Sequence, residues 1–277
     1  MLQETALPKR RNSTFKEDMS YRIITEQTEG SAALARQLAD STRTLVLTGA
    51  GISTESGIPD FRSPGGLWSR MEPISYDAFV ADEDARLEDW NRRFQMHEIF
   101  MRADPNPAHK VIAQMARKGP VAHVVTQNID GLHGRAGTPA EKLTEIHGTC
   151  AHAHCLSCGE RTNIAYARQY IASNEISPRC PVCGGLVKAA VVSFGETVPM
   201  EKLARAQQEA VSCDLLVAVG SSLVVYPVAA LPAMAKAAGA TIVIVTGTAT
   251  EQDEIADIVI RSPIAGTFSP LEEIGFD

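Results

Sequence analysis

Two Cys-x-x-Cys pairs constrain the fold of this chain more than any other feature. Cys155 and Cys158 form the first pair, and Cys180 and Cys183 form the second, beyond a gap of 21 residues (159–179). This gap is slightly longer than the roughly 15–20 residues usual in a zinc ribbon. A glycine follows each pair and tolerates the left-handed turn that points backbone N–H groups at thiolate sulfur. Four thiolates complete a tetrahedral Zn²⁺ site, so we predict a structural zinc module without an open catalytic position.

Three other side chains near the first pair are competing metal ligands, namely Cys150, His152 and His154. The two pairs already supply four thiolates, so we expect none of the three to bind the metal. Cys213 is expected to be a buried free thiol. Metal-bound cysteines in place of disulfides are typical of a reducing compartment. We therefore expect a cytoplasmic protein.

Short apolar runs alternate with amphipathic stretches through the rest of the chain. Strands are expected at 43–48, 121–126, 189–193, 215–219, 241–245 and 255–260. Helices are expected at 29–39, 106–118, 199–212 and 227–238. Continuous apolar strands separated by helices indicate a parallel sheet covered on both faces. The predicted fold is therefore α/β, a Rossmann-like parallel sheet with helices on both faces plus a small inserted zinc-ribbon domain.

The expected domain organisation follows from where this alternation breaks. Residues 147–189 are rich in cysteine and form the zinc module, whereas 23–146 and 190–277 form the Rossmann-like domain. A charged, helical insertion is expected at about 65–104. Residues 1–22 contain a basic cluster but no apolar run. This composition predicts a disordered leader and argues against a secretory signal. No final helix is evident after Arg261.

Composition and charge limit the partners of the chain. Hydrophobic residues make up 44% of its 277 residues, enough for a large core. A formal net charge of −7 argues against direct nucleic-acid binding, which needs a basic face. No run approaches the roughly 20 apolar residues of a membrane span, so no membrane association is expected. The sequence leaves the oligomeric state open.

A glycine-rich loop follows the first predicted strand directly. It reads Gly49-Ala50-Gly51-Ile52-Ser53, and its glycines let backbone amides approach a pyrophosphate. The loop departs from the dinucleotide-binding fingerprint, because the third glycine position is Thr54. Taken alone it is equally consistent with a tight strand-to-helix turn. A comparable loop, Gly220-Ser221-Ser222, follows the predicted strand at 215–219.

The continuation of the first loop places a carboxylate, an aromatic ring and a guanidinium next to one another. Asp60, Phe61 and Arg62 lie in a Gly/Pro-rich stretch that also contains Trp68. Arg62 can pair with a phosphate, and Phe61 can cover a planar ring. The alternative is an ordinary surface loop closed by an ion pair between Asp60 and Arg62.

A polar turn and a single histidine complete the set of candidate residues. Gln127, Asn128 and Asp130 follow the strand at 121–126, where uncompensated polar side chains make poor core material. We favour a ligand site there over a capped turn. His147 ends the segment that leads into the cysteine pairs; an isolated histidine is more often structural, but near neutral pH it can serve as a general base.

Two apolar segments are suited to holding an extended peptide. Residues 191–196 and 220–227 follow or end predicted strands, and their free backbone groups can pair with a peptide laid between them. The alternative is two more core strands with their exits.

Taken in order, these segments resemble the sirtuins, the NAD-dependent protein deacylases. The resemblance runs from about residue 42 to 260 and rests on Gly49–Ser53, Gly57–Arg62, Thr126–Asp130, His147-Gly148, the two cysteine pairs, Phe194–Glu196 and Gly220–Ser222. It implies an enzyme, expected from a bacterium, that uses NAD to remove acetyl or other acyl groups from lysine in protein substrates. The products are nicotinamide and 2′-O-acyl-ADP-ribose.

The resemblance also implies roles for individual residues. His147 acts as general base on the ribose hydroxyls, while Asn128 and Asp130 orient the nicotinamide ribose and carboxamide. The residues expected to bind NAD are Gly49, Ala50, Gly51, Ser53, Asp60, Phe61, Arg62, Trp68, Gln127, Asn128, Ile129, Asp130, Gly220, Ser221, Ser222 and Thr246. Those expected to contact the substrate peptide are Val192, Phe194, Gly195, Glu196 and Val224.

The chain departs from the family pattern in two places. Many members have Asn where this chain has Thr246, so we expect a weaker or shifted contact with the adenine ribose. Members that prefer acidic acyl groups carry a Tyr-x-x-Arg pair in the first insertion. The nearest residues here are Asp89 with Arg92, or Trp90 with Arg93, and neither pair matches. Acetyl or apolar acyl groups are therefore expected to be preferred over succinyl.

Other functions remain open on the sequence alone. ADP-ribosyl transfer to protein, or hydrolysis of NAD, would use every motif named above. A zinc-ribbon interaction module on a nucleotide-sensing scaffold is the alternative outside enzymes, and the acidic net charge argues against its nucleic-acid form. A hydride-transferring dehydrogenase is disfavoured by the missing third glycine.

Overall fold

The computed structural model of the protein describes residues 21–60 and 72–273. In this part of the chain, seven strands form one sheet, and every neighbouring pair in it is parallel. The strands, in spatial order, are β1 (Arg22–Ile24), β10 (Ile258–Ile260), β9 (Thr241–Val245), β8 (Leu215–Val219), β2 (Thr44–Thr48), β3 (Val121–Thr126) and β4 (Leu143–Glu145). The predicted parallel sheet is confirmed.

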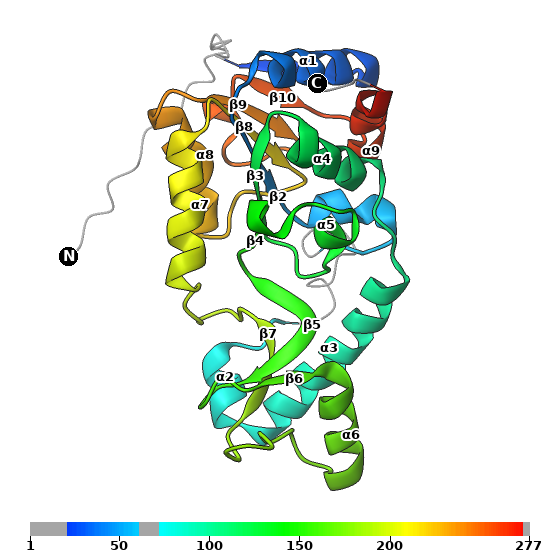
Figure 1. The fold of residues 1–277 in the computed structure, drawn as a ribbon, viewed down its shortest axis with the longest axis vertical. Coiled ribbons are helices and arrows are strands. Elements are labelled where there is room, and N and C mark those ends of the chain that lie inside the picture. Colours follow the sequence, from blue (N-terminus) through cyan, green and yellow to red (C-terminus); the bar gives the residue numbers. More distant parts are fainter. Residues whose placement is uncertain (1–20, 61–71, 274–277) are drawn as a thin grey trace, which may run out of the picture.

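Helices cover both faces of this sheet (Figure 1). One face packs against α1 (Gln27–Asp40), α4 (Pro107–Lys118) and α9 (Ile264–Phe268), and the other against α7 (Met200–Ser212) and α8 (Leu231–Ala237). Successive residues of a strand point to opposite faces. Accordingly Val46 of β2 packs in the first core cluster, whereas Leu45 and Leu47 pack in the second. The predicted two-sided burial therefore follows from a strand whose three central residues are all apolar.

A second, smaller unit lies beyond the carboxyl ends of the strands, in the lower part of Figure 1. Its three-stranded antiparallel sheet has the order β6 (Arg161–Asn163), β5 (Gly148–Cys155) and β7 (Val187–Val191). The helices α2 (Tyr76–Ala81), α3 (Glu83–Arg102) and α6 (Ile164–Asn174) accompany it. Trp90 of α3, Ile164 of α6 and Val187 of β7 share one buried apolar cluster. Helices from the 65–104 stretch and the cysteine-rich segment thus have a common core.

Three expectations from the sequence need correction. The apolar run at 189–193 is expected in the parallel sheet, but its strand, β7 (Val187–Val191), pairs antiparallel with β5 in the small sheet. A terminal helix was not expected, yet α9 is present and packs on α4 and α1. Arg22 is expected in the leader, but it begins β1 and pairs with Ile258. A buried apolar run does not reveal its partner strand, and a five-residue helix is too short to show a period.

Within residues 21–60 and 72–273, no helix is long and apolar enough to cross a membrane.

Two histidines are buried where α4 meets the short helix α5 (Leu132–Arg135) beneath the sheet. His109 is 0% exposed and His133 is 2% exposed, and their ring centroids lie 5.0 Å apart. Neither ring nitrogen of His109 has a hydrogen-bond partner among the described residues. Burial lowers the pKa of His109 to about 4 and that of His133 to about 3. Both rings are therefore neutral in the folded protein at neutral pH.

We predict that these rings make the fold acid-sensitive well above pH 4. The unfolded chain takes up protons below a pKa of about 6.5, whereas folded His109 does not until about pH 4, so stability falls as the pH drops through this window. For His109 the loss between pH 7 and pH 4 is about 3 kcal/mol. Urea unfolding from pH 7 to pH 5 should show a shallower loss for His109→Leu than for the unsubstituted protein. His97→Leu, on α3, is the control, and equal slopes in both variants would contradict the prediction.

Candidate functional site

The loops that follow five parallel strands meet at one edge of the large sheet. β2, β3, β4, β8 and β9 all end there, because parallel strands present their carboxyl ends on the same side. The chain passes from β2 to β3 on one side and later returns to place β8 on the other side of β2. This reversal is the place where open α/β sheets bind ligands. A cavity with a volume of about 710 Å³ opens at this edge.

Most residues predicted from the sequence line this one cavity. Those from the predicted NAD site are Gly49, Ala50, Gly51, Asp60, Gln127, Asn128, Ile129, Gly220, Ser221, Ser222 and Thr246. Those from the predicted peptide segments are Val192, Phe194, Gly195, Glu196 and Val224, and His147 joins them. Ser53 and Asp130 line a smaller adjoining recess of about 20 Å³, which shares Asn128 with the cavity. The predictions for Phe61, Arg62 and Trp68 lie outside the described residues.

Glycines allow the two loops that flank the reversal to touch through their backbones. Gly51 N donates to Gly220 O at 2.8 Å, and Gly49 N donates to Val219 O at 3.0 Å. A Cβ atom on Gly51 would lie 2.8 Å from Gly220 Cα, and one on Gly220 would lie 2.3 Å from Ile52 N. Gly220 also has a φ of 61°, which disfavours any side chain. The residue type at these positions therefore fixes how closely the two loops approach.

The polar turn after β3 is held by hydrogen bonds within the site. Asn128 Nδ2 donates to Gly49 O at 3.1 Å and to Ser53 Oγ at 3.2 Å. Ser53 Oγ in turn donates to Asp130 Oδ2 at 2.8 Å, and Leu132 N donates to Asp130 Oδ1 at 2.9 Å. Burial raises the pKa of Asp130. This network fixes the amide and the carboxylate relative to the first glycine loop.

His147 is oriented by a backbone carbonyl next to this turn. Its Nδ1 lies 3.2 Å from Gln127 O, so a proton on Nδ1 donates to the carbonyl and leaves Nε2 with a free lone pair. Burial lowers the pKa of His147, and the hydrogen bond to Gln127 O opposes that shift. The ring is therefore neutral at pH 7 and can accept a proton at Nε2.

The helix α3 contributes side chains to the cavity that the sequence did not assign to it. Asp89, Arg92, Arg93, Met96 and Ile99 all line it. A charged and partly apolar helix gives no local signal of facing a cavity, because the cavity forms only when α3 packs near β5, far along the chain.

The four paired cysteines gather at one end of the small sheet. Their sulfur atoms all lie within 4.8 Å of one another. The Sγ atoms of Cys155 and Cys183 are 3.5 Å apart, and those of Cys158 and Cys180 are 3.7 Å apart. Zn–S bonds of about 2.3 Å in a tetrahedron require sulfur–sulfur separations of about 3.8 Å. The cluster therefore fits a Zn²⁺ ion with four thiolate ligands.

The predicted glycine turns of this cluster are confirmed. Gly159 and Gly184 have φ angles of 76° and 73°, in the left-handed region. Ser157 N and Val182 N point at cysteine sulfur, at 3.3 Å from Cys155 Sγ and 3.4 Å from Cys180 Sγ. Among the described residues, the group of side chains placed to bind a metal ion consists of the four paired cysteines. The competing ligands Cys150, His152 and His154 are not part of it.

Fold and site together define an α/β protein with a ligand cleft at the reversal point of its sheet and a separate four-cysteine metal module. Residues 49–227 match the Sir2 family. An NAD-dependent protein deacetylase of Rhodopseudomonas palustris is 46% identical over 249 residues, which cover 90% of this chain and 98% of the relative. An NAD-dependent protein deacylase 2 of Archaeoglobus fulgidus is 43% identical over 227 residues, covering 82% and 88%.

Solved structures with this fold include sirtuin complexes. Sir2Tm bound to a propionylated peptide matches with a TM-score of 0.78 and 33% identity, covering 89% of this chain and 99% of that chain. A complex of Sir2 with a p53 peptide and NAD⁺ matches with a TM-score of 0.77 and 34% identity, covering 87% and 96%. The chain belongs to the Sir2 family, the sirtuins.

The metal site yields a prediction that a matched cysteine can control. Cys180→Ala should remove bound zinc and lower the thermal stability of the protein, because three thiolates leave the tetrahedron open. Cys180 and Cys213 are almost equally buried, 5% and 6% exposed. Cys213→Ala is therefore the control, because it removes a similarly buried thiol that is not part of the cluster. Zinc per chain, measured by inductively coupled plasma mass spectrometry, should fall toward zero only in Cys180→Ala. Full zinc retention in that variant would contradict the assignment.

Proposed function

We propose that the protein is an NAD⁺-dependent protein-lysine deacylase that transfers an acyl group from lysine to the ADP-ribose portion of NAD⁺. The products are deacylated lysine, nicotinamide and 2′-O-acyl-ADP-ribose. The observation that carries this proposal is a neutral His147 whose Nδ1 is held by Gln127 O in the cavity that Asn128 also lines. Membership of the Sir2 family and the names of the relatives support the same reaction.

We assign residues of the cavity to successive parts of NAD⁺. The loops that meet at Gly51 and Gly220 both line the cavity, and we assign them to the pyrophosphate. Gln127 Nε2 donates to Ser221 Oγ at 2.8 Å, and the two side chains offer groups to a ribose. Thr246 follows β9 and lines the cavity, and we assign it to the adenine ribose. Phe61, Arg62 and Trp68 remain predicted contacts.

The chain's own side chains have distinct tasks in the reaction. NAD⁺ supplies the electrophilic ribose carbon and the nicotinamide leaving group. Asn128 and Asp130, fixed through Ser53, orient the nicotinamide end. His147 Nε2 then accepts a proton from a ribose hydroxyl, so that the oxygen can attack the acyl carbon. Because burial keeps the imidazole neutral, the base is available at neutral pH.

We place the entrance of the acyl-lysine substrate between two loop segments. Residues 192–196 and 224–226 both line the cavity, and the side chains of Phe194 and Tyr226 are 46% and 71% exposed. An extended peptide can pair with backbone groups of both segments. Residues 23–146 and 190–277 would then bind NAD⁺, and 147–189 would hold zinc and frame the substrate entrance.

The surroundings of the protein are part of the same proposal. All six cysteines are free thiols, and four of them form the metal cluster, as expected in a reducing cytoplasm. The partners are proteins that carry acylated lysine. The acidic net charge of −7 supports the expectation of no direct nucleic-acid binding.

The proposal predicts a specific loss in His147→Ala. Mass spectrometry of an acetyl-lysine peptide incubated with NAD⁺ and the unsubstituted protein should show deacetylated peptide together with acetyl-ADP-ribose. In His147→Ala the rate should fall by about 10²- to 10⁴-fold, the usual contribution of a general base, while NAD⁺ still binds. His152→Ala removes a histidine further along β5 that does not line the cavity, and its rate should match that of the unsubstituted protein.

Other products would redirect the assignment. Free ADP-ribose with an unchanged peptide would indicate NAD⁺ hydrolysis, and ADP-ribosylated protein would indicate transfer to a different acceptor. DNA binding without NAD⁺ consumption would favour the zinc-ribbon interaction module. Equal rates in His147→Ala and the unsubstituted protein would remove His147 from the mechanism.

A further inference from the structure

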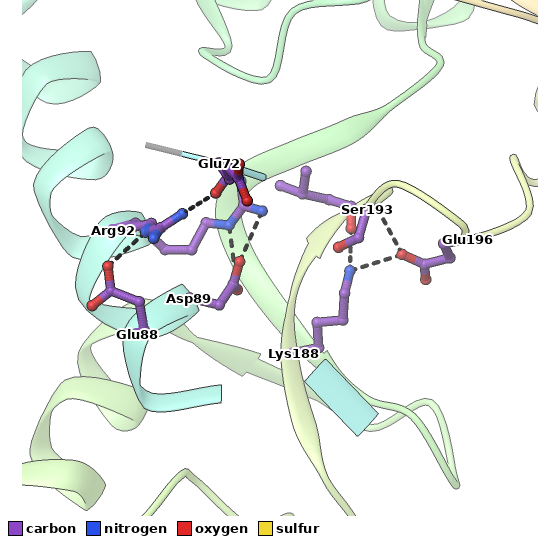
Figure 2. Close-up of polar contacts among 9 residues, drawn as sticks. Glu72, Glu88, Asp89, Arg92, Lys188, Ser193 and Glu196 are labelled. Carbon is purple, nitrogen blue, oxygen red and sulfur yellow. Dashed lines mark hydrogen bonds and ion pairs between the residues drawn. The ribbon is translucent and has the colours of Figure 1, made fainter. Parts of the chain in front are cut away.

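The two segments between which we place the peptide are held in place in different ways. The first, 192–196, is held by a buried ion pair, in which Lys188 Nζ lies 2.9 Å from Glu196 Oε2. Ser193 N donates to the same carboxylate oxygen at 2.8 Å, as Figure 2 shows. The second segment, 224–226, is held by a neutral side chain from a remote part of the chain. The reaction proposed above gives that side chain no task.

This neutral side chain is Gln252, in the connection between β9 and β10. Its Nε2 donates to Leu223 O at 3.0 Å and to Ala229 O at 2.6 Å. The two carbonyls lie at opposite ends of the loop 223–229, whose residues 224–226 line the cavity. One amide group therefore bonds to both ends of the loop that forms this side of the proposed peptide entrance.

The position of Gln252 has an energetic cost that packing does not explain. Gln252 Oε1 is buried and has no hydrogen-bond partner among the described residues. A buried acceptor without a partner destabilises a folded protein, because it has lost its bonds to water. An apolar side chain of similar length would fill the same space without this cost. What the amide adds is its two donors, and both of them are directed at loop 223–229.

The loop needs a restraint at the residue where it begins. Leu223 has a φ of 55°, in the left-handed region that is unfavourable for a bulky side chain. Its N–H donates to Ser221 Oγ at 3.2 Å and its carbonyl accepts from Gln252, so both backbone groups are fixed. Its side chain is 2% exposed and packs in the second core cluster. This left-handed residue sets the direction in which the chain enters 224–226.

We propose that Gln252 is a positioning residue for the substrate peptide, which holds loop 223–229 in the conformation that pairs with the peptide backbone. The inference rests on the proposed deacylase function and concerns how the same site recognises the residues around acyl-lysine. An extended peptide pairs with N–H and C=O groups that stand at fixed positions. A loop that is already ordered binds the peptide with a smaller loss of conformational entropy. Gln252 itself does not line the cavity, so it acts through the loop.

Substrates with and without flanking residues separate this role from a general effect on folding. One is a peptide with several residues on either side of acetyl-lysine, and the other is a single acetyl-lysine blocked at both ends. Gln252→Met removes both donors and keeps a side chain of similar length. We expect kcat/KM for the peptide to fall about tenfold through a higher KM, as two lost hydrogen bonds imply. For blocked acetyl-lysine it should change less than about twofold, because that substrate has few backbone groups to pair with the loop.

Two further variants make the test specific. Glu251→Gln is the matched control, because it changes an exposed side chain one position earlier in the same connection, and kcat/KM for both substrates should stay within about twofold. Gln252→Glu keeps the shape of the side chain but presents only acceptors to the carbonyls of Leu223 and Ala229 at neutral pH. It should lower kcat/KM for the peptide at least as much as Gln252→Met, and it replaces that variant if the methionine form does not fold.

Folding and function are read separately in this experiment. Far-UV circular dichroism and thermal melting establish which variants are folded. An equal loss for both substrates in a folded variant, or no loss for either, would overturn the role of Gln252. Failure of both Gln252 variants to fold would assign the residue to the stability of the fold and would also overturn it. Absence of nicotinamide release with both substrates on the unsubstituted protein would instead refute the deacylase function, and the inference with it.

Discussion

The backbone contact between the loops after β2 and β8 is the constraint on which the rest of the site depends. Gly51 N donates to Gly220 O at 2.8 Å, and neither residue has room for a Cβ atom. This contact holds the two loops together at the point where the strand order reverses, so that both line the same cavity. Asn128 bonds to the first of these loops, and His147 bonds to Gln127 O beside it. A wider separation of the loops would displace both side chains.

Polar side chains around the cavity already have hydrogen-bond or ion-pair partners within the protein. Asn128 is fixed by Ser53, and Arg93 is matched by Asp89. Such preorganisation favours charge development at a chosen place, because the groups do not have to reorient during the reaction.

The parts of the fold that the sequence predicted well are those with a strong local signal. Strands at 121–126, 215–219 and 241–245 match β3, β8 and β9 at both ends, because each is a short, mainly apolar run. The 189–193 run was placed in the wrong sheet, because apolar character does not specify a partner. The short helix α9 was missed, because five residues are too few for a period. The zinc cluster could be predicted from the cysteine spacing alone, because a Cys-x-x-Cys turn places both sulfur atoms on the same side.

The sequence by itself determined the parallel α/β architecture, the four-thiolate metal site and the loops that bear the candidate chemistry. Each of these depends on residues that lie close together along the chain, where periodicity, turn geometry and ligand spacing act. Tertiary structure decided which of those loops share one cavity and that α3 forms one of its walls. It also decided that Arg93 pairs with Asp89 and interacts with Cys150 of β5. These properties depend on burial and on distances between remote segments, and both come into existence only when the two units pack together.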